Sequence, residues 1–189
     1  MHEAPDDQTL LTRIARGDQD ALDLLYARHR PRLWRYAWQQ MDRNSSWAEE
    51  VVQDTFLAIW TAARGYRGDA SVATWIFRIA HHQTQKAWRA QGRQVHEVAI
   101  DEESALLAPI ESHEAAVVAR LALDEALTQL STKHRAVLEL LFFHGFSLDE
   151  VALILDIPVG TVKSRLSYAR RALHLEMSHV AAQEDAHDA

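Results

Sequence analysis

The sequence predicts an all-α protein of two small helical domains, joined by an acidic linker, with a helix-turn-helix in the C-terminal domain. Apolar residues recur every three or four positions through most of the chain, as in a helix with one buried face. The 189 residues include six glycines and four prolines, so long helices are possible. The helical spacing fails over residues 94–114, where acidic residues predict the linker. The domains are therefore predicted at 8–93 and 115–178, with a disordered tail at 179–189.

The N-terminal domain is expected to contain four main helices. They are predicted over residues 20–29, 31–41, 44–63 and 72–91. Pro31 is assigned to the first turn of the second of these helices, because the N–H that proline lacks would be unpaired there anyway. Ser45 and Ser46 are candidate N-caps for the third helix. The two glycines of residues 64–71 predict a loop before the fourth.

Residues 147–173 have the features of a helix-turn-helix. Ser147 and Glu150 form an S-x-x-E capping box at the start of a short helix, and "DIPVG" predicts the turn. The second helix is expected to begin between Val159 and Thr161. Its buried stripe is predicted to consist of Val162, Leu166, Ala169 and Leu173. The opposite side is polar and basic, which suits a helix that enters the major groove. The simpler alternative is a solvated basic face on a helical hairpin.

The composition excludes several classes of function. The chain has no cysteine, which excludes disulfides, thiol catalysis and cysteine-ligated zinc, and which fits a reducing cytoplasm. No signal-peptide pattern and no apolar run of about 18 residues is found, so we expect a cytoplasmic protein without membrane insertion. The adjacent His81 and His82, and the pair His174 and His179, do not have the spacing of a helical metal site. We therefore expect no metal, no cofactor and no catalytic residues.

Charge is distributed unevenly along the chain. The formal net charge is −7, but it is +5 over residues 61–93 and +2 over 131–173, with −7 over 94–130 between them. The field near a local basic face, rather than the total charge, decides whether phosphate can bind. The distribution therefore favours nucleic-acid binding by both domains.

Several stretches resemble bacterial sigma factors. Residues 123–173, above all "GTVKSRLSYARRAL", strongly resemble the domain that reads the promoter −35 element. "AEEVVQDTFLAIW", "VATWIFRIA" and "GDQDALDLLYARHRPRLWRYA" are similar to the N-terminal domain that binds polymerase and the −10 element. The short linker leaves no room for the middle domain of primary sigma factors, so the chain resembles the two-domain extracytoplasmic-function (ECF) type.

This resemblance implies a function, partners and site residues. The protein would direct core RNA polymerase to promoters and help to open the −10 element, without being an enzyme. Its partners would be promoter DNA, the clamp helices of the largest polymerase subunit, the flap, and an anti-sigma factor that could hold it at the membrane. Polymerase binding is implied for Glu50, Gln53 and Asp54. Binding of the −10 element is implied for Tyr66, Arg67, Ser71, Thr74, Trp75, Arg78, His82, Lys86 and Arg89. Binding of the −35 element is implied for Thr161, Lys163, Ser164, Arg165, Tyr168, Arg170 and Arg171.

Some features leave alternatives open. His82 stands where the family usually has Asn, and the family usually has an acidic residue near Lys86, so no −10 sequence preference can be carried over. The helix face that carries Glu50, Gln53 and Asp54 could simply be solvated, and Trp75 and Phe77 could be core residues. The linker could thread into polymerase as a nucleic-acid mimic or serve as a spacer. The alternative functions are a stand-alone helix-turn-helix regulator and a helical interaction module that does not bind DNA.

Overall fold

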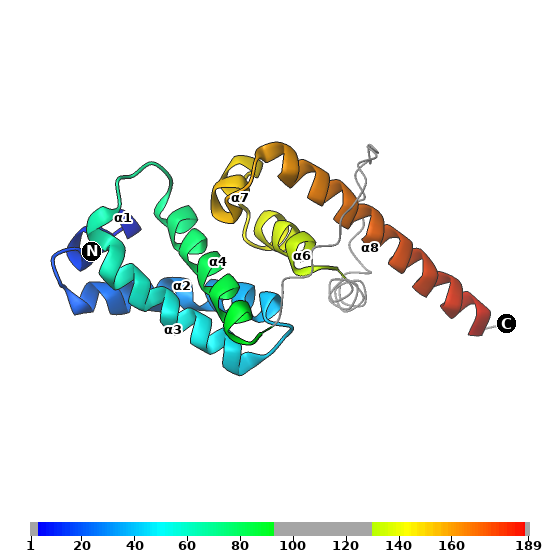
Figure 1. Cartoon of the computed structure of the whole chain (residues 1–189), viewed down its shortest axis with the longest axis horizontal. Helices are drawn as coiled ribbons and strands as arrows, with labels where there is room; N and C mark the ends of the chain where they lie inside the picture. The colour runs from blue at the N-terminus through cyan, green and yellow to red at the C-terminus, as the bar shows by residue number, and fades with distance from the viewer. Residues whose placement is uncertain (1–3, 93–129, 188–189) are drawn as a thin grey trace.

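The protein is helical throughout the part that the structure describes. The computed structural model describes residues 4–92 and 130–187, and side chains of the second range as far as residue 173. Within these two ranges the regular elements are all helices and no strand is present. Figure 1 shows two groups of helices, one from each half of the chain, lying side by side. The predicted all-α fold is confirmed, whereas the predicted linker at 94–114 lies outside the described residues.

The N-terminal group is built around one apolar core. Its helices are α1 (Asp7–Ile14), α2 (Gln19–Gln40), α3 (Ser45–Ala62), the 3-10 turn η1 (Ala63–Gly65) and α4 (Val72–Ala90). α2 packs against α1, α3 and α4. The core side chains include Leu10, Leu25, Tyr36, Ile59 and Phe77, none of which is more than 1% exposed. Burying each large apolar side chain contributes roughly 1.5–3 kcal/mol, so this group can hold α3 and α4 in fixed positions.

α2 continues through Pro31, so the prediction that a new helix begins there is wrong. Proline inside a helix removes one backbone hydrogen bond and costs about 3 kcal/mol. The residues on both sides of Pro31 nevertheless bury their side chains in one core, with Leu25 before it and Leu33 and Tyr36 after it. Pro31 itself is exposed. Burial on both sides of the proline therefore outweighs the lost hydrogen bond.

Polar side chains cap the helices of this domain at their N-termini. Asp6, Asp18 and Ser71 each accept a hydrogen bond from the backbone N–H three residues further on. The cap of α3 is Asn44, whose side chain accepts from the N–H of Trp47 at 3.0 Å. The prediction that Ser45 or Ser46 caps this helix is therefore wrong by one or two residues. Asn44 has extended backbone angles, as an N-cap residue requires.

We expect Asn44→Ala to destabilise the protein by about 1 kcal/mol, because one N–H of the first turn of α3 loses its acceptor. Ser45→Ala is the matched control, since Ser45 is exposed and already inside the helix. Its effect should stay within roughly 0.5 kcal/mol. Urea denaturation followed by far-UV circular dichroism measures both. Equal destabilisation by the two substitutions would contradict the assignment of Asn44 as the cap.

The C-terminal group contains the predicted helix-turn-helix. Its elements are α6 (Thr132–Leu138), one π-helical turn η2 (Glu139–Phe143), α7 (Leu148–Leu155) and α8 (Val159–His187). α6 packs against α8, and α7 packs against α8 across the turn. The backbone of α8 continues past residue 178, where the sequence predicts the end of the domain.

Local contacts define the helix-turn-helix as the sequence predicts. The Ser147 side chain accepts from the N–H of Glu150 at 3.3 Å, and the Glu150 carboxylate accepts from the N–H of Ser147 at 3.0 Å, so the capping box is complete. α7 ends at Leu155, and its C-cap residue Asp156 has the left-handed conformation with φ of 55°. In α8, Val162 and Ala169 are fully buried. The capping box is therefore confirmed, and the predicted stripe is fully buried at Val162 and Ala169 but only half-buried at Leu166 and Leu173, which pack against a buried cluster.

The two groups of helices pack directly against each other. α4 lies along α7, and α2 contacts α6, as Figure 1 shows. The apolar core is continuous across this contact, because Phe146 and Leu155 of the C-terminal group belong to the same buried cluster as Phe77. The face of α4 that carries several predicted DNA-binding residues is therefore turned towards the C-terminal domain.

Candidate interfaces for DNA and polymerase

The first half of α8 presents an exposed polar and basic surface. Lys163, Ser164, Arg170 and Arg171 are all exposed, on the side opposite the buried stripe. Ser164 donates a hydrogen bond to the carbonyl of Thr161 at 3.1 Å, within the first turn. Arg170 lies over the ring of the exposed Phe142, 5.4 Å from its centroid. Four of the seven residues predicted to bind the −35 element thus lie on one accessible surface.

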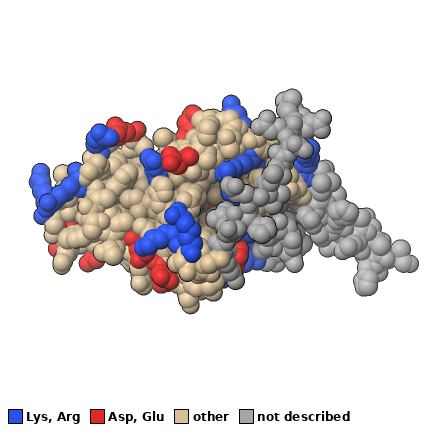
Figure 2. Space-filling model, in the orientation of Figure 1, with Lys and Arg blue, Asp and Glu red and all other residues tan. Residues whose placement is uncertain are grey.

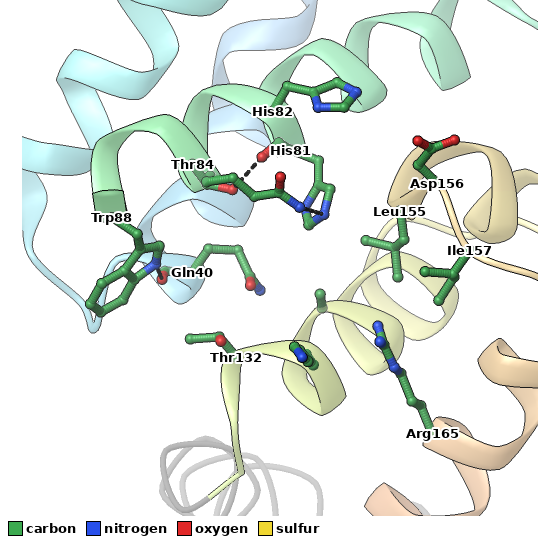
Figure 3. A pocket seen from close by; sticks show the side chains of 13 residues that line it. Gln40, His81, His82, Thr84, Trp88, Thr132, Leu155, Asp156, Ile157 and Arg165 are labelled. Atoms are coloured by element: carbon green, nitrogen blue, oxygen red, sulfur yellow. Dashed lines mark hydrogen bonds between the residues drawn. The ribbon is translucent and has the colours of Figure 1, made fainter. Parts of the chain in front are cut away.

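Two other residues of the predicted −35 set lie on the side of α8 that faces α6. Tyr168 is half-buried and stacks on His134, with ring centroids 4.3 Å apart. Arg165 is half-buried and lines a cavity between the two domains. Thr161, the remaining residue of the predicted −35 set, is half-buried at the start of the helix. In this arrangement of the domains, Arg165 points into the protein rather than towards a groove of DNA (Figure 3).

The loop before α4 is braced by an aromatic pair. Tyr66 and Trp75 make an edge-to-face contact at 5.4 Å, and the Tyr66 hydroxyl donates to the carbonyl of Ala70 at 2.6 Å. Ser71 caps α4 by accepting from the N–H of Thr74. Arg67 is exposed beside the loop. Both rings are half-buried, so the pair holds the loop in shape while part of each ring stays accessible for stacking on a base.

The first half of α4 contacts the C-terminal domain, which buries Thr74 but leaves the Arg78 side chain 46% exposed. Thr74 is 1% exposed and donates to the Glu150 carboxylate at 2.9 Å. The hydrogen bonds that Glu150 accepts, from the Ser147 backbone and from Thr74, hold its pKa below the usual range, so it is ionised. Arg78 lies 3.3 Å from the carboxylate of Asp156. Phe77 is fully buried, as the structural alternative expects.

The last turns of α4 are more accessible. His82, Lys86 and Arg89 are exposed. Lys86 forms an ion pair with Asp54 of α3, at 2.9 Å. Lys86 belongs to the predicted −10 set and Asp54 to the predicted polymerase set, so the structure brings members of two sets into contact.

An exposed strip on α3 contains the residues predicted to bind polymerase. Glu50 and Gln53 are exposed, and Asp54 is partly exposed. Leu57 lies on the same side, four residues after Gln53, and is 63% exposed. Sequence reasoning missed Leu57, although an apolar residue outside the buried stripe and next to a polar strip was a usable signal.

A cavity of about 320 Å³ opens between the two domains. Figure 3 shows His81 and Trp88 of α4 on one side of it and Thr132, Leu155 and Arg165 on the other. The Tyr36 hydroxyl lies 2.9 Å from Nδ1 of His81. Burial, with the nearby charges of His82 and Arg165, lowers the pKa of His81 to about 4. His81 is therefore neutral at physiological pH.

We expect the stability of the protein to fall as the pH is lowered below about 6.5. The unfolded chain protonates His81 near pH 6.5, while the folded chain resists protonation until about pH 4. The unfolded state therefore binds more protons between these values, and folding weakens as the pH falls. Between pH 7 and 5, His81 should account for a loss on the order of 1–2 kcal/mol. Urea denaturation of His81→Gln should show a weaker pH dependence over this range, and an unchanged dependence would contradict the assignment.

Charged side chains do not form one continuous basic surface on the face that Figure 2 draws. Lys and Arg gather there in separate places with acidic side chains between them, outside the area that grey atoms cover. In the described ranges, no three metal-ligating side chains gather into a site. The same residues contain no helix that is long and apolar enough to cross a membrane.

Comparison with known proteins identifies the family. The sigma-70 region 2 profile matches residues 25–94, and the sigma-70 region 4 profile matches residues 120–173. The chain is 30% identical over 177 residues to the RNA polymerase sigma-H factor of Pseudomonas aeruginosa, covering 88% of this chain and 91% of that protein. It is 31% identical over 188 residues to the ECF RNA polymerase sigma-E factor of Escherichia coli, covering 92% and 95%. This chain belongs to the ECF family of RNA polymerase sigma factors. It directs polymerase to promoters to initiate transcription, and as a sigma factor it is an initiation factor rather than an enzyme.

Two solved structures resemble this chain over most of its length. This sigma factor is 27% identical to CnrH, whose structure was determined in complex with the cytosolic domain of CnrY, with a TM-score of 0.67 over 92% of this chain and 97% of that one. It is 26% identical to the sigma factor RpoE of Bartonella quintana in complex with the anti-sigma factor NepR, with a TM-score of 0.62 over 82% and 96%.

Proposed function

We propose that this sigma factor works through three surfaces, each assigned to a partner. The strip on α3, formed by Glu50, Gln53, Asp54 and Leu57, docks on the clamp helices of the largest polymerase subunit. Its carboxylates, exposed at Glu50 and partly exposed at Asp54, suit basic partner side chains, and Leu57 supplies an exposed apolar contact at the C-terminal end of the strip. The exposure of this strip, on a helix fixed by the N-terminal core, is the observation that carries the assignment.

The other two surfaces bind promoter DNA. The loop braced by Tyr66 and Trp75, with the accessible end of α4, captures the opened −10 strand by stacking and phosphate contact. The exposed side of α8 enters the major groove at the −35 element, as the second helix of a helix-turn-helix does. Lys163 and Arg171 are placed for phosphates, and Ser164 for a base edge.

Run-off transcription with purified core polymerase tests this function. We expect the wild-type chain to give transcripts with defined 5′ ends on genomic fragments upstream of the genes it controls. A stand-alone regulator or a helical interaction module would give no specific start site with core polymerase alone. Absence of specific transcripts over the whole fragment set would therefore overturn the proposal.

We also propose an anti-sigma factor as a regulatory partner and a cytoplasmic location, with the complex held at the membrane when the anti-sigma factor is itself membrane-bound. The structurally similar RpoE was determined with an anti-sigma factor, which supports a partner of the same kind here. Fractionation of cells under inducing and non-inducing conditions tests this location. A chain found in the same soluble fraction under all conditions would contradict membrane retention.

A further inference from the structure

A buried amide with an unpartnered nitrogen lines the cavity between α4 and α6. Gln40 is 3% exposed, and its Nε2 has no hydrogen-bond partner. Figure 3 shows this side chain directed into the cavity from the end of α2. A buried donor without an acceptor costs about 1–3 kcal/mol, and buried polar groups in native proteins nearly always have partners. The unpartnered nitrogen therefore indicates that the cavity receives a group that can accept a hydrogen bond.

An indole lies beside this amide. The Nε1 of Trp88, on α4, donates to the backbone carbonyl of Gln40 at 3.0 Å. Trp88 is half-buried, and Figure 3 shows it with Gln40 at one end of the cavity. Proteins bind nucleobases with the same two groups, because an aromatic face stacks on the base and an amide hydrogen-bonds to its edge. This end of the cavity therefore suits a planar heterocycle.

The other end of the cavity is positively charged. Lys133 of α6 and Arg165 of α8 both line it, and Figure 3 shows the Arg165 guanidinium directed inwards from the C-terminal domain. Burial, with the charges of these two residues, lowers the pKa of His134, so both cations lie near the same part of α6. Asp156 is the only carboxylate among the described lining residues, and it lies 3.3 Å from Arg78. This end of the cavity therefore suits an anion.

Charge and size together restrict the ligand. Two cations suit a phosphate monoester, which carries a charge of about −1.5 to −2 and which Arg and Lys commonly bind. The volume of about 320 Å³ lies near the lower limit for small-molecule sites, roughly 300 Å³. Ala136, Leu155 and Ile157 supply apolar walls for the body of the ligand. These features fit one heterocycle with one phosphate rather than a dinucleotide.

We propose that this cavity binds a mononucleotide, with its base against Gln40 and Trp88 and its phosphate at Lys133 and Arg165. Arg165 also belongs to the residues proposed to bind the −35 element. One guanidinium cannot meet a phosphate inside the cavity and a base edge of DNA at the same time, so the nucleotide competes with −35 recognition. This consequence rests on the proposed function of α8, whereas the site itself does not.

Isothermal titration calorimetry of the full chain with each of the four nucleoside monophosphates tests the site. The matching nucleoside and inorganic phosphate are the reference probes, because each carries one half of the ligand. We expect at least one monophosphate to bind saturably and at least about tenfold more tightly than either reference probe. Binding of all probes with equal affinity would contradict a site that holds base and phosphate together.

Two substitutions at opposite ends of the cavity locate the bound nucleotide. Gln40→Leu should lower its affinity at least about fivefold. This variant should stay folded, because it removes a buried donor that has no acceptor in the folded chain. Lys133→Gln should lower the affinity by a similar factor. Arg16→Gln is the matched control, since it removes a positive charge from an exposed position outside the cavity, and it should leave the affinity unchanged.

Promoter binding by the reconstituted holoenzyme tests the competition. Saturating nucleotide should raise the apparent Kd of the wild-type holoenzyme for a promoter duplex at least about threefold. The holoenzyme with Lys133→Gln should respond much less, because its sigma factor binds the nucleotide weakly. Both holoenzymes contain the same core polymerase, so this comparison removes any effect of the nucleotide on the core.

Absence of saturable binding for all four monophosphates would overturn the proposal and would mean that the cavity holds only water. Affinity unchanged by both Gln40→Leu and Lys133→Gln would place the nucleotide elsewhere and would overturn it as well. If the nucleotide binds as proposed but leaves promoter affinity unchanged, the competition is wrong, and so is the proposed contact of Arg165 with DNA. Specific run-off transcription without nucleotide binding would contradict only the site, whereas absent transcription would contradict the proposed function.

Discussion

Glu50→Arg combined with Gln53→Ala should remove stable binding to core polymerase while the protein stays folded. Both side chains are exposed on α3, so the substitution disturbs no core contact. Reversing the charge of Glu50 places a cation against the basic partner surface that we propose, and like charges across an interface cost several kcal/mol. We expect the apparent Kd to rise roughly 30-fold or more, which corresponds to about 2 kcal/mol. Fluorescence anisotropy of labelled sigma factor titrated with core polymerase measures it.

The control variant makes the same kinds of substitution, an acidic residue to Arg and a Gln to Ala, at exposed positions outside the strip. Asp23→Arg with Gln8→Ala alters exposed residues of α2 and α1, outside the three proposed surfaces, and should bind core polymerase normally. A change at Asp54 is a less direct test, because Asp54 holds Lys86 and its substitution would also disturb α4. Wild-type affinity in the double variant would show that this strip is a solvated helix face.

The sequence was most informative where the deciding contacts are local. The capping box between Ser147 and Glu150 depends on residues three positions apart, and the buried positions Val162 and Ala169 follow from the helical period alone. The same holds for the exposed strip on α3, whose polar residues fall outside the buried stripe. In each case the residues that decide the structure lie within two helical turns of one another.

Other features depend on contacts that a single helix does not reveal. Pro31 is a local signal for a helix start, but the core that Leu25 and Tyr36 share with other helices keeps α2 continuous. Arg35 and Glu139 are 104 positions apart, and neither has a neighbour in sequence that predicts their ion pair. Thr74 could be assigned to DNA from the family pattern, yet its burial against Glu150 follows from how the domains dock.

The family resemblance and the structure group the residues of α4 differently. The resemblance assigns residues by their position in a motif, and it treats Thr74, Arg78 and Lys86 alike. The structure separates them, because the first two contact the C-terminal domain and the third contacts α3.

Two substitutions in α8 should affect DNA binding in different ways. Lys163 is exposed near the start of the helix and is proposed to meet phosphate, which carries no sequence information directly. Lys163→Ala should weaken binding to all DNA by a similar factor and reduce the salt slope by about one unit. The family resemblance implies that Arg165, which lines the cavity between the domains here, binds the −35 element, and we propose that it reaches a base edge when α8 enters the major groove. A good base contact is worth about 1–3 kcal/mol of discrimination, so Arg165→Ala should reduce the preference for the −35 element about 5- to 150-fold.

The measurement is binding of the reconstituted holoenzyme to a promoter duplex and to its single-base −35 variants at several salt concentrations. Arg16→Ala, which removes an exposed charge from the N-terminal domain, is the control for a general loss of positive charge. If Arg165→Ala lowers every affinity by the same factor, Arg165 meets phosphate and another residue of α8 reads the bases. If neither Lys163→Ala nor Arg165→Ala changes binding, the basic side of α8 is a solvated face. A flattened preference with Arg165→Ala, together with a reduced salt slope with Lys163→Ala, would place the first turns of α8 in the major groove, because that arrangement gives neighbouring residues two different kinds of DNA contact.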